Sequence, residues 1–227
     1  MKINLSSKSI ADVFITIVTL LVTAHIVQVT LYHLDVFDYS RFLDFDTENN
    51  LPSFYSAMAI EFCAILLLII YLHSKNTNRK EAGYWLGLAI IFAFLGFDET
   101  AQIHEIVSDF FTLIVDASGV LYFPWVLPYG LATGLVALIY WPWLRRLPRV
   151  SRNGFVIAGG VFVSGAIGIE MVSASVADVY SVSDWRYTIF YTVEETLEMS
   201  GIVLFIRALV RHMTQHIHQV TFDFSEE

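Results

Sequence analysis

Six long apolar segments constrain this chain more than any other feature of its sequence. Each holds about 20 mainly apolar residues, the length that an α-helix needs to cross the hydrocarbon core of a bilayer. The segments cover residues 10–33, 52–73, 84–106, 124–144, 154–177 and 187–210. We therefore predict an all-α fold, a polytopic membrane helical bundle with six transmembrane helices. Residues 1–227 would form a single domain, with a polar cytoplasmic tail over 211–227.

Composition agrees with a membrane protein, because 15% of the residues are charged and soluble domains average about 25%. The first apolar segment continues to Leu34, which is longer than the apolar core of a signal peptide, so we expect it to remain as a helix. The net charge of −9 comes with no basic stripe, which argues against a nucleic-acid partner. Cys63 is the single cysteine, so a disulfide framework and a thiolate metal site are excluded.

Basic residues indicate how the helices are oriented, because cytoplasmic loops of membrane proteins hold an excess of Lys and Arg. If the N-terminus is cytoplasmic, eleven of the thirteen basic residues fall on the cytoplasmic side and only Arg41 and Arg186 fall outside. The eleven are Lys2, Lys8, Lys75, Arg79, Lys80, Arg145, Arg146, Arg149, Arg152, Arg207 and Arg211. We therefore predict an N-in, C-in topology in a membrane of the bacterial inner-membrane type.

Ionisable residues inside the predicted helices share one depth. At 1.5 Å per residue, Asp98 lies ~22 Å above the inner boundary near Gly83, and Glu170 lies ~24 Å above Gly154. His25 and Glu61 lie ~13 Å below the outer boundary, and residues 194–198 lie ~10–16 Å below it. These groups belong to five of the six predicted helices, yet all of them fall in the outer half of the membrane.

The helical periodicity aligns these residues on faces. On the third predicted helix, Asp98, Gln102, Glu105 and Asp109 form one stripe. On the sixth, the stripe comprises Tyr187, Tyr191, Glu194, Glu198 and Gly201. The acids of the second and fifth helices share faces with small residues, which mark close helix packing in membranes. We therefore expect Glu61 and Glu170 to point into the bundle.

The charge balance of this region is one-sided. Eight carboxyl groups lie in or near the outer half of the membrane, and no Lys or Arg lies at matching depth. The eight are Glu61, Asp98, Glu99, Glu105, Glu170, Glu194, Glu195 and Glu198. An uncompensated buried carboxylate is costly, so these groups must be protonated, hydrated or bound to cations. A polar outer vestibule is the alternative, and it explains Glu105 and Asp109 equally well.

Carboxylates with one or two imidazoles suit Fe, Mn, Mg or Ca better than Zn or Cu. The set resembles di-iron and di-manganese sites of helical bundles, but it lacks their Glu-x-x-His motif. We predict a site for divalent metal ions, with Fe or Mn favoured and Zn or Ca as further candidates. The predicted ligands are Glu61, Asp98, Glu99, His104, Glu105, Glu170, Glu194, Glu195 and Glu198. Tyr187 and Tyr191 would line it, and His25 is either a second imidazole or a hydrogen-bonded core residue.

The first outer loop holds a second acidic pattern, in the stretch LDFDTENNLP. Asp44, Asp46 and Glu48 alternate as in a calcium loop, so they are candidates for an outer-loop cation site. The glycine and the distal glutamate that such a loop requires are missing. A turn rich in Asp and Asn that leads into Pro52 explains the pattern equally well.

Four stretches, LDFDTENNLPSFYS, FDETAQIHE, WVLPYG and VEETLEMSG, together resemble a group of hypothetical bacterial multi-pass inner-membrane proteins. The resemblance covers most of residues 40–207, and its most specific parts are the DE…HE and EE..E motifs. It implies a six-helix membrane fold. It also marks the family's motif positions, which are Asp98, Glu99, His104, Glu105, Glu194, Glu195 and Glu198. It brings no activity with it.

Three functions remain open from the sequence. The first is an intramembrane metal site, open to the periplasmic side, for redox or hydrolytic chemistry on a lipid or small molecule. The second is a proton- or cation-coupled transporter, in which the carboxyl groups form a relay. The third is a sensor or assembly protein that binds Ca²⁺ structurally. Membrane lipids are the expected surroundings in each case.

Overall fold

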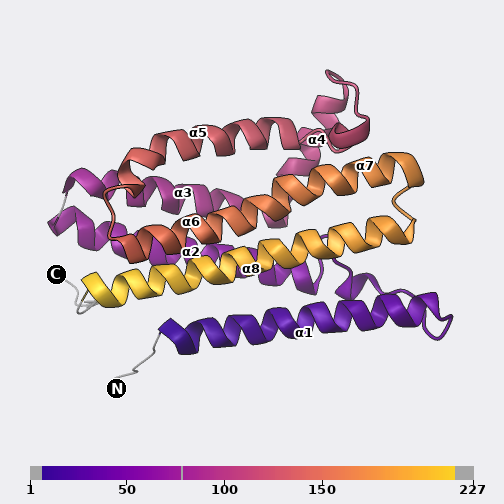
Figure 1. Cartoon of the computed structure of the whole chain (residues 1–227), viewed down its shortest axis with the longest axis horizontal. Helices are drawn as coiled ribbons and strands as arrows, with labels where there is room; N and C mark the ends of the chain where they lie inside the picture. Colours follow the sequence, from indigo (N-terminus) through magenta and orange to yellow (C-terminus); the bar gives the residue numbers. More distant parts are fainter. Residues whose placement is uncertain (1–6, 78, 218–227) are drawn as a thin grey trace, which may run out of the picture.

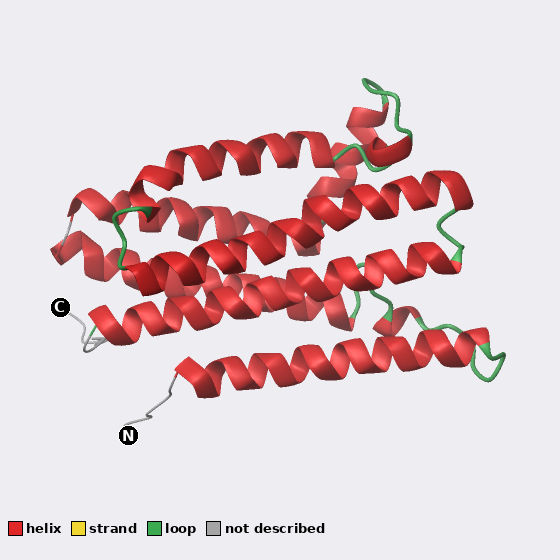
Figure 2. Ribbon diagram, viewed as in Figure 1, coloured by secondary structure: helices red, strands yellow, loops and turns green. Residues whose placement is uncertain are grey.

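The computed structural model describes residues 7–77 and 79–217, and within these residues it contains helices and no strand (Figures 1 and 2). The α-helices are α1 (Ser7–His33), α2 (Leu51–Thr77), α3 (Arg79–Ala101), α4 (Ile103–Thr112), α5 (Val126–Leu144), α6 (Arg149–Val163), α7 (Glu170–Tyr180) and α8 (Trp185–His216). Two short 3₁₀ helices, η1 (Arg41–Leu43) and η2 (Gly119–Leu121), lie in the connections. A π-helical segment, η3 (Ser164–Ile169), joins α6 to α7 without a break.

Five helical stretches are long and apolar enough to cross a membrane, and they coincide with the first five predicted segments. They are Lys8–His33, Leu51–Thr77, Lys80–Ala101, Val126–Leu144 and Arg149–Tyr180. The sixth predicted segment lies in α8, which has the length but not the apolar composition, because it carries Glu194, Glu195 and Glu198. Helix α8 continues to His216, so the first residues of the predicted polar tail over 211–227 are helical. Residues 218–227 lie outside the described part.

The long helices lie roughly parallel in one bundle (Figure 1). The start of α1 and the end of α8 lie together at one end, which we call the terminal end. Helix α4 and the connection between α1 and α2 lie at the opposite end, which we call the α4 end. Helix α2 packs most extensively on α3, and α6 packs most extensively on α8.

Two glycines bring α6 and α8 into close contact. A Cβ added to Gly201 would lie 2.6 Å from the backbone nitrogen of Phe162, so this crossing point accepts glycine alone. A Cβ added to Gly165 would lie 2.8 Å from the backbone oxygen of Glu194. Small residues let helix backbones approach in this way in membranes. The close approach holds the acidic turn of α8 against the π-helical segment.

The third predicted helix, over residues 84–106, is interrupted. Helix α3 ends at Ala101, and Gln102 adopts a left-handed conformation with φ 54° and ψ 41° before α4 begins at Ile103. The predicted stripe of Asp98, Gln102, Glu105 and Asp109 therefore does not exist as one helical face. Neither glycine nor proline marks the break, so the sequence pattern offered no signal for it.

The interior of the terminal end is apolar and aromatic. Trp85 and Trp143 are fully buried there and meet edge to face, with ring centroids 4.7 Å apart. Closer to the middle of the bundle, Phe92 and Phe205 stack with centroids 4.6 Å apart. Cys63, the free cysteine, is fully buried in the same core. This packing separates the terminal end from the polar interior of the α4 end.

Candidate functional site

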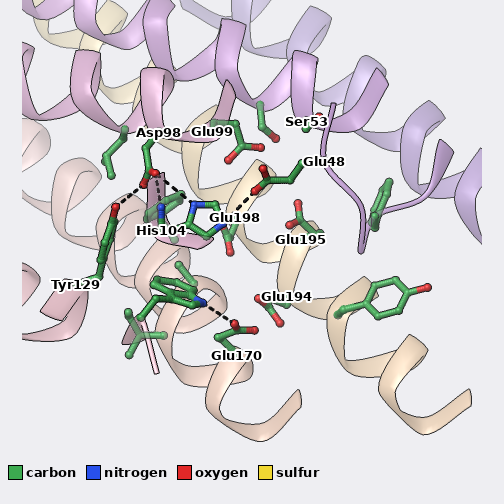
Figure 3. A pocket seen from close by; sticks show the side chains of 18 of the residues that line it. Glu48, Ser53, Asp98, Glu99, His104, Tyr129, Glu170, Glu194, Glu195 and Glu198 are labelled. Atoms are coloured by element: carbon green, nitrogen blue, oxygen red, sulfur yellow. Dashed lines mark hydrogen bonds and ion pairs between the residues drawn. The ribbon is translucent and has the colours of Figure 1, made fainter. Parts of the chain in front are cut away.

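A polar cavity of about 230 Å³ lies inside the α4 end of the bundle. Nine acidic residues line it, and no Lys or Arg is among its described lining residues. The nine are Asp46, Glu48, Asp98, Glu99, Glu105, Glu170, Glu194, Glu195 and Glu198. Figure 3 shows that carboxyl groups from α3, α7, α8 and the connection between α1 and α2 face one another across it. We call these residues, together with His104, the acid cavity.

The break at Gln102 places His104 in this cavity. Because the chain turns at Gln102, the Asp98 carboxylate reaches past the end of α3 and accepts a hydrogen bond from the backbone N–H of His104 at 2.8 Å. This bond satisfies one of the free N–H groups at the start of α4. The same carboxylate accepts a 2.8 Å hydrogen bond from the hydroxyl of Tyr129 on α5. Asp98 thus ties α3, α4 and α5 together.

The imidazole of His104 is held between two carboxylates (Figure 3). Its Nδ1 lies 3.3 Å from Oδ1 of Asp98, and its Nε2 lies 2.9 Å from Oε1 of Glu48. Burial alone would lower the pKa of His104, but the hydrogen bonds to Asp98 and Glu48 raise it to about 11. His104 is therefore protonated at neutral pH in this arrangement.

Glu48 has one more acceptor than the protein satisfies. Its Oε2 atom is buried and has no hydrogen-bond partner among the described residues. The Nε2 of His104 and the Oε1 of Glu48 are 2.9 Å apart. Two ligands that each lie ~2.1 Å from one ion at a right angle are ~3 Å apart. Glu48 and His104 form an ion pair at this distance, and the same distance would suit two adjacent ligands of one metal ion once Nε2 has lost its proton.

Glu170 and Glu194 meet through one hydroxyl group. The Oγ of Ser173 lies 3.1 Å from Oε2 of Glu170 and 2.9 Å from Oε2 of Glu194. A hydroxyl has one proton to donate. The same Oγ lies 3.0 Å from the backbone oxygen of Glu170, so three oxygen atoms compete for its one proton. Trp125 completes the arrangement by donating its indole N–H to Glu170 at 3.0 Å.

The π-helical segment sets the direction of Glu170. An extra residue per turn over Ser164–Ile169 shifts the helix register directly before Glu170, the first residue of α7. Insertions of this kind are rare in proteins, and those that occur are often found at functional sites. Glu170 is 8% exposed as a result and faces the acidic turn of α8.

A family model for a domain of unknown function, DUF8692, matches residues 13–213. The chain belongs to the DUF8692 family. No curated protein and no solved structure matches it. The matched region includes every residue that lines the acid cavity, so the cavity lies wholly within the DUF8692 domain.

Most of the predicted site residues of this DUF8692 protein do come together. Eight of the nine predicted metal ligands line the acid cavity: Asp98, Glu99, His104, Glu105, Glu170, Glu194, Glu195 and Glu198. Glu105 lies at its rim, with 62% of its side chain exposed, as the vestibule alternative implied. Tyr187 and Tyr191 line the cavity as predicted.

Two residues that were candidates for the site, Glu61 and His25, do not line the acid cavity. Glu61 packs between α2 and α3, where a Cβ on Gly96 would approach its Oε1 to 2.7 Å, and it does not line the cavity. His25 is fully buried, with Nδ1 3.0 Å from the backbone oxygen of Leu43 and Nε2 3.1 Å from the hydroxyl of Thr192. His25 is therefore the hydrogen-bonded core residue of the two alternatives.

The three acids of the outer loop do not form a separate cation site. Asp44 accepts from the backbone N–H of Asp46 at 3.1 Å, which is the turn that Asp residues favour, and from the hydroxyl of Tyr39 at 2.5 Å. Asp46 accepts from Tyr187 at 2.6 Å. Asp46 and Glu48 line the acid cavity instead. The loop folds back over the bundle, and the sequence pattern carried no information on that fold.

Sequence reasoning missed four partners of the acids: Trp125, Tyr129, Ser173 and the loop residue Asn50. The first three donate hydrogen bonds to carboxyl groups of the cavity. Asn50 holds the loop by donating to the backbone oxygens of Asp44 and Thr47, each at 2.6 Å. Ser173 lies one helical turn after Glu170, but the sequence did not show that its hydroxyl lies between Glu170 and Glu194.

The side chains as they stand do not surround one point. Among the described residues, no group of three or more His, Cys, Asp and Glu side chains is arranged to hold a metal ion. Glu99, Glu195 and Glu198 nevertheless face the same cavity as His104 and Glu48 (Figure 3). Rotation about their side-chain bonds changes where their carboxyl groups lie and requires no movement of the backbone.

Proposed function

We propose that this DUF8692 protein is a membrane metalloprotein whose acid cavity binds divalent metal ions, with Fe or Mn favoured. The observation that carries the proposal is the charge imbalance of the cavity, in which nine carboxyl groups face one imidazole and no described Lys or Arg. Carboxylates that are removed from water require protons or cations. Oxygen ligands with one imidazole match the preferences of Mn and Fe.

Within this proposal, His104 binds through Nε2 and Glu48 through its carboxylate. Asp98 holds the other ring nitrogen of His104, as carboxylates commonly do behind a metal-bound histidine. Glu99, Glu195 and Glu198 supply further oxygens by side-chain rotation, and the pair Glu170 and Glu194 supplies a second group. The bound metal would provide redox or hydrolytic chemistry on a lipid or small molecule.

We further propose six transmembrane helices with both ends of the chain in the cytoplasm and the cavity open to the periplasmic side of a bacterial inner membrane. Helix α8 is the sixth span, since its three glutamates face the cavity and not lipid. The distribution of Lys and Arg supports this orientation.

Transport through the bundle is the weaker alternative. The cavity ends on the apolar residues Ile60, Leu95 and Ile202. The stacked rings of Phe92 and Phe205 belong to the buried core that packs around these residues. A relay of protons or cations would need polar groups along that path.

Metal analysis of the detergent-purified protein tests the proposal. After expression with ample Fe, Mn and Zn, we expect about one to two equivalents of metal per chain, as for carboxylate sites of helical bundles. His104→Gln and Glu48→Gln should each lower the metal affinity about 10- to 100-fold, because each removes a ligand or its support.

Glu61→Gln is the matched control, because Glu61 is an acid of the same bundle that lies outside the cavity. It should leave the metal content unchanged. Less than about 0.2 equivalents of any metal in the unchanged protein would reject a specific site. Equal metal content in His104→Gln and the unchanged protein would reject the ligand assignment.

A further inference from the structure

A groove lies beside the acid cavity, where α2 begins and α3 ends. Its volume is about 360 Å³, and it shares Ser53 and Glu99 with the lining of the cavity. The full lining is Phe42, Asn49, Asn50, Leu51, Ser53, Phe54, Glu99 and Thr100. The two spaces therefore adjoin, and Glu99 stands between them.

The rim of the groove is apolar and faces outward. Phe42 is 62% exposed and Phe54 is 61% exposed. On the same side, α2 continues with exposed Met58 and α3 carries exposed Phe97. If α2 and α3 cross the membrane, these side chains contact lipid. The groove then joins the lipid-facing surface of the protein to the acid cavity, at the level where the helices leave the membrane.

Charge and size limit what can enter by this route. The acidic lining repels an anionic headgroup, because like charges repel strongly inside a protein, where they are screened less than in bulk water. The cavity of about 230 Å³ is smaller than a typical pocket for a whole ligand. It accommodates a small polar end, while a chain attached to that end must lie in the groove and the bilayer.

We propose that the groove admits a membrane lipid with a small uncharged polar end. The chain of the lipid lies against Phe42 and Phe54, and its hydroxyl or carbonyl oxygens pass Glu99 into the acid cavity. This inference rests on the proposed metal site, since it names the substrate on which that site acts.

Photo-crosslinking in lipid nanodiscs tests the route. The nanodiscs contain phosphatidylcholine with a minor fraction of a long-chain monoacylglycerol that carries a diazirine near its polar end. A second preparation contains phosphatidylglycerol with the same label. We expect the uncharged probe to label residues 42–54 and 99–104, as mapped by mass spectrometry. Labelling by the anionic probe should be about tenfold lower.

Two types of variant locate the binding. Thr100→Phe fills the groove, and Thr100 is exposed, so the change adds bulk without disturbing the core. Ala93→Phe adds the same bulk at another exposed position of α3, outside the groove. Thr100→Phe should reduce labelling about tenfold, and Ala93→Phe should not change it. Phe54→Ala removes part of the rim and should also reduce labelling.

Equal labelling by the two probes, or equal labelling of Thr100→Phe and Ala93→Phe, would overturn the inference. Melting curves of both variants establish that each is folded. Metal content, measured on the same samples, separates this inference from the proposed function. Metal without selective labelling would reject the lipid route alone, and selective labelling without metal would reject the metal site alone.

Discussion

His104 is the residue on which the acid cavity depends most, because it is the single imidazole among the described lining residues. The sequence predicted that His104 belongs to the site, from its depth along the predicted helix and from the chemistry of its imidazole. It did not predict the contacts of the ring, since one partner, Glu48, belongs to a loop and the other, Asp98, lies across a helix break. Pairing of this kind depends on the path of the backbone, which periodicity does not describe.

The pKa of His104 leads to a prediction on the metal-free protein. Because the folded protein raises this pKa from 6.5 to about 11, the pairing stabilises the fold fully below pH 6.5. The stabilisation is then lost as the pH rises towards 11. Loss of one partner of a buried pair costs about 3 kcal/mol, so His104→Gln should lower the melting temperature at pH 6 by roughly 6–12 °C.

Melting curves in detergent with a chelator, at pH 6 and at about pH 10, measure this difference. The gap between His104→Gln and the unchanged protein should shrink at the higher pH, since above pH 6.5 the imidazole of the unfolded chain loses its proton while that of the folded protein keeps it. His25→Gln serves for comparison. A gap that stays constant across this range would show that His104 is neutral in the folded protein.

At the scale of elements, two irregular segments build the site. The break at Gln102 and the π-helical segment before Glu170 both interrupt helices that the sequence predicted to be regular. The five helices that are long and apolar enough to cross a membrane were readable because a membrane span requires a set length and an apolar composition. The two interruptions depend on specific contacts, such as the hydrogen bond between Asp98 and the backbone N–H of His104 at the start of α4. They do not change the apolar content of the segments, so hydropathy does not reveal them.

Gln102 provides a test of the break. Its φ of 54° lies in the region that glycine adopts without strain. Gln102→Gly should therefore raise the free energy of unfolding by about 0.5–1 kcal/mol, or roughly 1–4 °C in melting temperature. Gln102→Val should lower it by a similar amount or more, because a β-branched residue is strained there. Differential scanning fluorimetry measures both.

Ala93→Gly gives the reference value for a regular position of α3. Glycine in a helix interior costs roughly 0.5–1 kcal/mol, so this variant should melt lower than the unchanged protein. If Gln102→Gly also melts lower by the same amount, residue 102 continues the helix and His104 is not directed into the cavity.

At the scale of the whole molecule, acids from α3, α4, α7, α8 and the connection between α1 and α2 converge on one cavity. The acids lie at similar depths along their predicted helices, and this was enough to predict which helices supply side chains to the site. Position along a helix converts directly into a distance. Depth was not enough for the loop, whose route back over the bundle depends on Asn50. Glu61 was included because its helical face carries small residues, but this side chain packs against Gly96 of α3 and not into the cavity.

Topology is the molecular property that cysteine labelling tests directly. Cys63 is fully buried, so it needs no replacement. Asp38→Cys and Ser183→Cys should react in intact cells with a maleimide that does not cross the membrane. Asn76→Cys and Gln215→Cys should react only after the cells are opened. The four positions are exposed, so reactivity reports the side of the membrane. The reverse pattern would place the acid cavity on the cytoplasmic side.

The composition of α8 also bears on how the chain is made. This helix carries three glutamates and is the last of the long helices to leave the ribosome. Buried carboxyl groups make the transfer of an isolated α8 into lipid unfavourable. Its partners Gly165 and Ser173 lie in η3 and α7, which are made before it. Synthesis from the N-terminus therefore delivers this polar helix after the segments that contact its glutamates.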